Sequence, residues 1–371
     1  MRMINRVTLA VTGSVALSVT LAAGAMAAPA RPASFIGGFG TLTTIASTVP
    51  ANGDVNPYGV AVVRHSQGKL VRGNVLVSNF NNSANQQGTG TTIVSVSPHG
   101  AVRLFARITA AGPARACPGG IGLTTALSIL DGGWVVVGSL PTTGGDPATS
   151  KAGCLLVLDS QGRVVETFTG HGINGPWDMT AVNFGPVAVL FVTNVLNGTV
   201  AAKGAQVNRG TVLRLLVTTP REGLARPRLL HADVIGSGFA EKTDPNALVI
   251  GPTGVGLGVR GTLYVADTLG NRITAIPDAL FRRGSAGTGR VVTTGRGLTG
   301  PLGLAIAPGG DIVTANSGDG NLVETTPRGV QAPVKMVTPG GGGALFGLAI
   351  APDGSGVYFV DDSVNTLVLL H

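Results

Sequence analysis

Asp178 is the residue whose type and position in this chain best suit chemistry. It is the second residue of an apolar run, residues 177–182, at a place where comparable runs carry glycine: Gly59, Gly122, Gly254, Gly303 and Gly347. A carboxylate in a structural glycine position breaks a local rule, and such departures are expected at functional sites. Trp177 offers an apolar wall beside it, and His171 in the preceding loop offers a partner that titrates near neutral pH. An Asp that only accepts backbone hydrogen bonds is an equally good interpretation.

Five further polar residues end short apolar runs, and they allow two interpretations. They are Asn79, Asn194, Asp267, Asn316 and Asp361. Short Asn and Asp side chains accept hydrogen bonds from the N–H groups of a following turn. A ring of such oxygens could instead hold Ca²⁺, which prefers several oxygen ligands. Because these residues recur at equivalent positions, we favour turn fastening. A metal site would use Asp178, Asn194 and Asp267, and we expect no cofactor other than this optional Ca²⁺.

The elements that position these residues form a repeat. A glycine beside an alternating apolar run, a turn, and a second apolar run that ends in a polar residue occur six times. The copies begin near residues 58, 120, 177, 253, 302 and 346. Alternation is the pattern of a strand, and repeats built from short strands are typical of β-propellers.

The two ends of the chain predict how the ring closes. The last repeat has three strands and stops at His371, whereas residues 39–46 form a strand without a blade. Pairing of these two segments would remove the open sheet edges. The sequence therefore predicts an all-β fold, a six-bladed β-propeller over residues 28–371 with the N-terminal strand completing the last blade. The expected blades are residues 58–107, 120–170, 175–230, 251–294, 300–338, and 345–371 with 39–46.

This architecture also predicts where a ligand binds. The start of each inner strand and the end of each second strand face one end of the central channel, and loops at such an end commonly bind ligands. His171 would lie in a loop beside this mouth. The other side chains expected there are Tyr58, Asn79, Trp177, Asp178, Asn194, Asp267, Asn316, Phe346 and Asp361.

Residues 264–273 read YVADTLGNRI and resemble the NHL repeat, whose hallmark is V-A-D, a short loop and N-R-I. The resemblance implies a six-bladed propeller, similar in build to lactonases of the gluconolactonase group and to strictosidine-synthase-like proteins. Calcium-dependent lactonases of that group use an acidic residue at the start of an inner strand with Asn and Asp from other blades. Asp178, Asn194 and Asp267 echo this set. The acidic entry to the first blade of those lactonases is absent, because residues 56–59 read Asn-Pro-Tyr-Gly.

The N-terminus predicts export from a bacterial cell. Arg2 and Arg6 precede an apolar stretch, and small residues follow it, so we expect residues 1–27 to be a cleaved signal peptide. The destination would be the periplasm, the cell wall or the exterior. Export permits a disulfide between Cys117 and Cys154, which we favour over two buried free thiols.

Net charge and amino-acid composition limit the classes of binding partner that we expect. The chain carries a net charge of +8, with its densest arginine cluster over residues 221–228 and a second at Arg282 and Arg283. Export argues against nucleic acid, and few aromatic residues are available to stack on bases. We expect a monomer without a membrane span after signal cleavage, whose partner is a small molecule, a protein or an envelope polymer.

The leading hypothesis is a non-catalytic binding or scaffold protein; the alternative is a Ca²⁺-dependent lactonase or hydrolase centred on Asp178.

Overall fold

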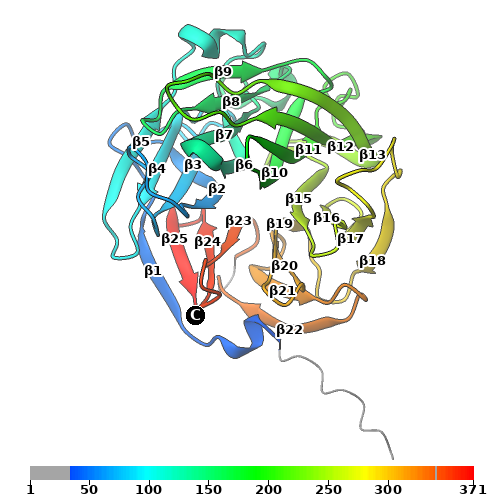
Figure 1. Cartoon of the computed structure of the whole chain (residues 1–371). Helices are drawn as coiled ribbons and strands as arrows, with labels where there is room; N and C mark the ends of the chain where they lie inside the picture. Colours follow the sequence, from blue (N-terminus) through cyan, green and yellow to red (C-terminus); the bar gives the residue numbers. More distant parts are fainter. Residues whose placement is uncertain (1–33, 339–340) are drawn as a thin grey trace, which may run out of the picture. The chain divides into compact units, whose positions relative to one another are not determined.

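A computed structural model of the chain describes residues 34–338 and 341–371. Six antiparallel sheets are arranged in a ring around a central channel, as Figure 1 shows. The protein is therefore the six-bladed β-propeller that the repeats predict. The expected signal peptide, residues 1–27, lies outside the described residues. No helix of the described part is long and apolar enough to cross a membrane.

Each blade runs from an inner strand beside the channel to an outer strand at the rim. The first two blades contain β2 (Val55–Val62), β3 (Val75–Asn81), β4 (Thr92–Val96) and β5 (Val102–Arg107), then β6 (Leu123–Leu130), β7 (Trp134–Ser139), β8 (Cys154–Leu158) and β9 (Val164–Phe168). The next two contain β10 (Gly175–Phe184), β11 (Val187–Val195), β12 (Val207–Thr218), β13 (Leu229–Asp244) and β14 (Leu248–Ile250), then β15 (Pro252–Leu257), β16 (Leu263–Asp267), β17 (Arg272–Ile276) and β18 (Arg290–Thr294).

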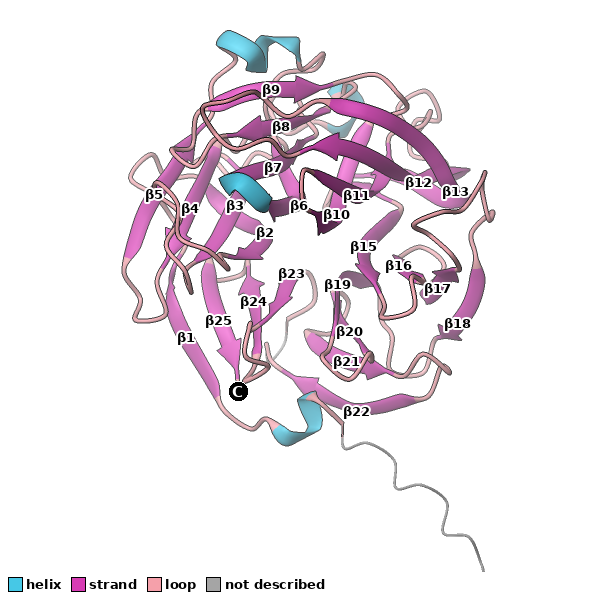
Figure 2. Ribbon diagram, in the orientation of Figure 1, coloured by secondary structure: helices cyan, strands magenta, loops and turns pink. Residues whose placement is uncertain are grey.

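The last two blades complete the ring. They contain β19 (Pro301–Ile306), β20 (Ile312–Asn316), β21 (Asn321–Thr325) and β22 (Gln331–Met336), then β23 (Leu345–Ile350), β24 (Val357–Asp361), β25 (Thr366–Leu370) and β1 (Leu42–Ser47). Helical structure in the described part is limited to four short 3₁₀ turns: η1 (Ile36–Gly38), η2 (Gly112–Ala116), η3 (Asp131–Gly133) and η4 (Pro147–Thr149). Figure 2 shows these turns among the strands.

The N-terminal strand closes the ring, as the orphan segment predicts. β1 pairs antiparallel with β25, from Leu42 opposite Leu370 to Ser47 opposite Thr366. The N–H of His371 donates to the Thr41 carbonyl at 2.9 Å, and the Thr41 N–H donates back at the same distance. The last blade thereby gains its fourth strand, and its free edge is covered.

A buried carboxylate holds the segment that precedes β1. Glu324 on β21 accepts hydrogen bonds from the Ser34 hydroxyl (2.7 Å) and from the N–H groups of Phe35 and Ile36 (both 2.9 Å). Ile36 is itself fully buried, in a cluster that joins the last two blades. The N-terminal segment is therefore fastened to the fifth blade before its strand completes the sixth.

The third blade differs from the expected one, which was to end near residue 230. Its outer strand, β13, begins at Leu229 and continues to Asp244, and a fifth strand, β14, follows it. The pairing of β12 with β13 contains four register shifts, and bulges of this kind interrupt the regular alternation of buried and exposed residues. That interruption explains why the strand is hidden in the sequence pattern.

The two cysteines form a disulfide in the pairing that the sequence suggests. Cys117, just after η2, bonds to Cys154 at the start of β8, with a Cα–Cα distance of 5.3 Å. Both residues lie in the second blade region and are buried.

Loss of the Glu324 carboxylate is expected to loosen ring closure. Glu324→Gln removes the charge that three donors share, and hydrogen bonds to a charged group contribute more than neutral ones. We expect the free energy of unfolding to fall by about 3 kcal/mol and the amides of Phe35 and Ile36 to exchange faster. Urea unfolding and amide hydrogen exchange measure both. Glu166→Gln on β9, whose carboxylate bonds only the adjacent Thr167 N–H, is the control; equal losses in both variants would contradict the anchoring role.

Candidate functional site

The six inner strands enclose a cavity of about 560 Å³. Its walls are mainly apolar side chains of β2, β6, β10, β15, β19 and β23. Residues of the turns that follow the inner strands also line it, among them Arg64, His65 and Asp131, and all three are exposed. The cavity therefore opens at the end of the ring where the inner strands finish.

The opposite end of the channel is closed by packed aromatic rings. Tyr58 stacks on Phe346 with ring centroids 4.0 Å apart, on Phe80 at 4.4 Å, and faces Trp177 at 6.1 Å. None of the four side chains is more than 5% exposed, and Leu302 joins the same cluster. We call the five residues Tyr58, Phe80, Trp177, Leu302 and Phe346 the aromatic plug.

The plug overturns the expected position of the mouth. Tyr58, Trp177 and Phe346 stand at the starts of inner strands, where the sequence predicted an opening. In the structure their rings fill that end of the channel. The channel is narrow there, so rings from different blades meet across it. β14 packs on the plug through Leu248 and Val249, and the Trp177 indole N–H donates to the Val249 carbonyl at 3.0 Å.

The Asn and Asp residues that end the second strands are buried, and two of them fasten the turn that follows. Asn79, Asn194, Asp267 and Asn316 have no exposed surface, and Asp361 is 9% exposed. Asn194 Oδ1 accepts from the N–H groups of Asn174 and Gly175 at 2.8 and 3.0 Å. Asp361 Oδ1 accepts from the Ser363 N–H at 3.0 Å. Asp267 and Asp361 therefore match the turn-fastening interpretation, whereas Asn194 holds the segment that leads into β10. The Oδ1 atoms of Asn79 and Asn316 are buried without a hydrogen-bond partner among the described residues. None of the five residues lines the channel cavity.

The structure does not bring the suggested calcium ligands together. Asp267 is engaged by the Arg272 guanidinium at 2.7 Å and by the Gly270 N–H, and the Asn194 oxygen is already shared by two donors. Asp178 lines the cavity, whereas the other two face their own turns. Among the residues that the structure describes, no group of three or more His, Cys, Asp or Glu side chains is placed to hold a metal ion. This donor set does not fit the proposed Ca²⁺ site.

Asp178 occupies the glycine position of its blade, as the sequence suggested. Its N–H donates to Thr193 Oγ1 at 3.0 Å, and that hydroxyl donates to the Thr253 carbonyl of the next blade. In the first blade the Gly59 N–H donates to Ser78 Oγ, which donates to the Thr124 carbonyl of the second blade. In both blades, therefore, the inner-strand N–H donates to a hydroxyl group that in turn donates to a carbonyl of the next blade.

The other glycines at this level have no room for a side chain. A Cβ on Gly254, Gly303 or Gly347 would collide with a backbone carbonyl of the next blade. Gly122, which the sequence grouped with them, lies just before β6 and outside the inner strand, so the second blade departs from the pattern. The third blade is thus the place where this ring position carries a carboxylate.

The carboxylate of Asp178 is buried at the closed end of the cavity. Its Oδ1 accepts a hydrogen bond from the Met179 N–H at 2.7 Å, and the Val255 N–H of the next blade also bonds to it. Burial raises the pKa of Asp178 to about 8, and the two N–H groups oppose the rise only in part. Near neutral pH the group therefore exchanges a proton readily.

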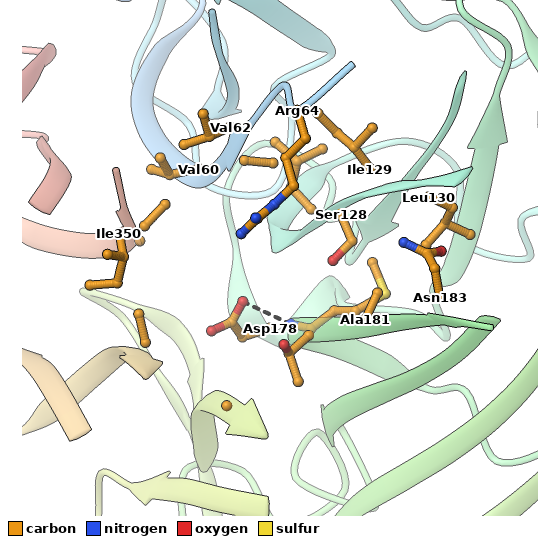
Figure 3. A pocket seen from close by; sticks show the side chains of 18 of the residues that line it. Val60, Val62, Arg64, Ser128, Ile129, Leu130, Asp178, Ala181, Asn183 and Ile350 are labelled. Carbon is orange, nitrogen blue, oxygen red and sulfur yellow. Dashed lines mark hydrogen bonds between the residues drawn. The ribbon is translucent and has the colours of Figure 1, made fainter. Parts of the chain in front are cut away.

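Arg64 is the cavity residue that the sequence analysis missed. Figure 3 shows its side chain extending into the cavity toward Asp178, with Val60, Val62 and Ile350 forming an apolar wall. No ion pair joins Arg64 to Asp178 in the described part of the chain. Arg64 lies two residues beyond the end of β2, so a search for polar residues at the ends of inner strands, rather than at their starts, would have found it.

His171 does not belong to this site. It lies in an exposed turn with φ of 51°, between β9 and β10, and it does not line the cavity. The suggested pairing of His171 with Asp178 is therefore absent from the structure. Figure 3 places Ser128 and Asn183 on the cavity wall instead.

Comparison with known proteins identifies the fold. No protein-family model matches the sequence, and no curated protein matches it. Similar solved structures include a gluconolactonase from Xanthomonas campestris (13% identity, 89% of this chain and 88% of that one, TM-score 0.56). They also include the PQQ-bound aldose sugar dehydrogenase from Streptomyces coelicolor (17%, 89% and 97%, 0.52) and the calcium-binding protein regucalcin from Agrobacterium tumefaciens (14%, 88% and 93%, 0.51). The chain shares the six-bladed propeller fold with these proteins.

The raised pKa of Asp178 predicts a pH-dependent contribution to stability. Between about pH 4 and pH 8 the folded protein keeps a proton that the unfolded chain has released, so this residue lowers stability as the pH rises through that window. Asp178→Asn removes the effect. The quantity to compare is the free energy of unfolding of the variant minus that of the native protein. We expect this difference to be about 3 kcal/mol larger at pH 8 than at pH 5.

Urea unfolding at the two pH values measures this difference. Asp131→Asn, at the exposed rim of the same cavity, is the control and should show no such trend. A difference between Asp178→Asn and the native protein that is the same at both pH values would contradict the assigned pKa.

Proposed function

We propose that the channel is the active site of a hydrolase that opens small cyclic esters, with Asp178 as the general base. The observation that carries this proposal is a buried carboxylate with a pKa of about 8 at the closed end of the channel cavity. A proton-transfer group works best when its pKa lies near the working pH, and strongly shifted values gather at active sites.

The residues on the cavity wall support a defined sequence of proton transfers. The ionised Asp178 takes a proton from a water molecule, and the resulting hydroxide adds to the ester carbonyl. The ring C–O bond then breaks, and the proton held by Asp178 passes to the departing alkoxide. The product is an open-chain hydroxy acid, and Asp178 returns to its ionised state.

Arg64 supplies the positive charge that this reaction needs. A guanidinium that enters the cavity opposite the base can stabilise the negative oxygen that forms on the attacked carbonyl. It can then pair with the carboxylate of the product.

The alternative from the sequence analysis, a hydrolase centred on Asp178, is supported better than the non-catalytic scaffold. The scaffold hypothesis rested on intact structural motifs with few acid–base residues, and it placed binding at a mouth that the aromatic plug closes. Several similar solved structures are named as enzymes, although at 13–17% identity they support the fold alone. Because the donor set fails to converge, the proposal assigns no step to Ca²⁺.

Hydrolysis of alkyl-substituted γ- and δ-lactones tests the proposal. We expect turnover whose kcat/KM rises about tenfold per pH unit and levels near pH 8. Asp178→Asn should lose at least about a hundredfold in kcat/KM, whereas Glu166→Gln on β9, which does not line the cavity, should keep the native value. A pH-titration assay of acid release measures all three proteins.

Two outcomes would contradict this assignment. The first is an absence of turnover across the lactone panel; the second is turnover that Asp178→Asn leaves intact. Treatment with EDTA is expected to leave the rate unchanged. If EDTA abolished the activity and Ca²⁺ restored it, the metal-dependent alternative would replace the metal-free mechanism.

We also propose that the protein is exported. The charge and apolar pattern of residues 1–27 supports this proposal. When the full gene is expressed in a bacterium, the protein recovered outside the cytoplasm should begin at Ala28, as mass spectrometry of the intact chain would measure. Recovery of an uncleaved chain from the cytoplasm would contradict export.

A further inference from the structure

Protruding apolar side chains lie on the third and fourth blades, on the side of the ring where the cavity opens. Leu224, Val259 and Phe281 are 80%, 82% and 84% exposed, the three highest values among large apolar residues in the described part of the chain. Phe184, at 48% exposure, ends β10 in the third blade. Single exposed apolar residues are ordinary, but the three most exposed ones share one feature of the fold.

All four residues belong to loops on the same side of the ring. Phe184 and Val259 stand where inner strands turn into second strands; Leu224 and Phe281 stand where third strands turn into outer strands. Adjacent strands are antiparallel, so first and third strands end on the same side. This is also the side on which the cavity opens, as its lining by Arg64, His65 and Asp131 indicates.

Hydrogen bonds join these loops into one surface. In the third blade the Thr219 N–H donates to the Pro186 carbonyl at 2.8 Å, and in the fourth the Ala279 N–H donates to the Gly261 carbonyl at 2.9 Å. Arg214 of the third blade donates to the carbonyls of Ala279 and Leu280 at 3.1 and 2.9 Å. The four apolar residues are therefore carried by neighbouring loops with fixed positions.

Arginines lie between the apolar residues on these loops. Arg221, Arg226, Arg260 and Arg283 are all exposed. Of the two acidic residues on the same loops, Glu222 is bonded to Gln67 at 2.7 Å, and Asp278 is exposed. We name the four apolar residues and these four arginines the mouth face; its net charge is positive.

We propose that the mouth face docks on an anionic phospholipid surface. Apolar side chains among arginines are the composition of surfaces that lie at the boundary between headgroups and acyl chains. Each arginine near an anionic bilayer adds attraction, and its planar guanidinium suits lipid phosphates. A docked protein would turn the cavity opening toward the lipid, so that apolar molecules dissolved in the membrane reach Asp178 directly.

Vesicle flotation tests the docking, using the chain that begins at Ala28. All six blades and the closing strand lie within residues 34–371, so this chain keeps the whole ring. We expect it to float with vesicles that contain phosphatidylglycerol, to float poorly with pure phosphatidylcholine, and to be released by high salt. The triple variant L224S/V259S/F281S should bind more than about tenfold more weakly, and so should R221Q/R226Q/R260Q/R283Q.

Matched variants elsewhere on the ring serve as controls. L104S/M336S/V364S removes three large apolar residues that are 49%, 65% and 62% exposed on other surfaces. R107Q/R115Q/K151Q/K203Q removes four exposed positive charges away from the mouth face. Both control variants should bind vesicles like the native chain. Asp178→Asn should also bind normally, so docking is measured independently of hydrolysis.

Three results would overturn the docking proposal. The native chain does not float with anionic vesicles; the control variants lose as much binding as the mouth-face variants; or the mouth-face variants bind as well as the native chain. A concentration-dependent dimer in size-exclusion chromatography that L224S/V259S/F281S abolishes, without vesicle binding by the native chain, would assign the face to a second copy instead.

Discussion

The packing of aromatic rings across one end of the channel is the interaction on which the candidate site depends. Tyr58, Trp177 and Phe346 meet at the starts of three inner strands, and their contact turns an open pore into a cavity with one entrance. Without this closure, water would reach the Asp178 carboxylate from both sides. Its burial, and hence its raised pKa, follows from the plug together with the contact between the third and fourth blades.

The distance between neighbouring blades explains why the third blade can carry a carboxylate where the fourth, fifth and sixth blades carry glycine. At Gly254, Gly303 and Gly347 the next blade approaches so closely that even a methyl group would collide with its backbone. At Asp178 the side chain instead bonds the Val255 N–H of the next blade. Asp178 therefore has a structural contact as well as the proposed catalytic one, and both interpretations of the sequence describe part of its surroundings.

The sequence predicted the ring and its closure because both depend on local alternation and on the count of strands at each end. It also singled out Asp178 as the residue that departs from the glycine pattern, because such a departure can be read from the sequence alone. It could not predict which end of the channel is open, because that depends on whether Tyr58, Trp177 and Phe346 meet across the axis. Arg64 was missed for the same reason. The long β13 was missed because its bulges interrupt the alternation that marks a strand.

The central claim is that the Asp178 carboxyl group titrates near neutral pH inside a cavity with a single entrance. Carbon-13 NMR of the side-chain carboxyl carbons of aspartate, recorded across pH and assigned through Asp178→Asn, measures this titration directly. The account predicts a midpoint near pH 8 for Asp178. A midpoint near 4, the ordinary value for an exposed aspartate, would show that the carboxylate is solvated and would contradict the account.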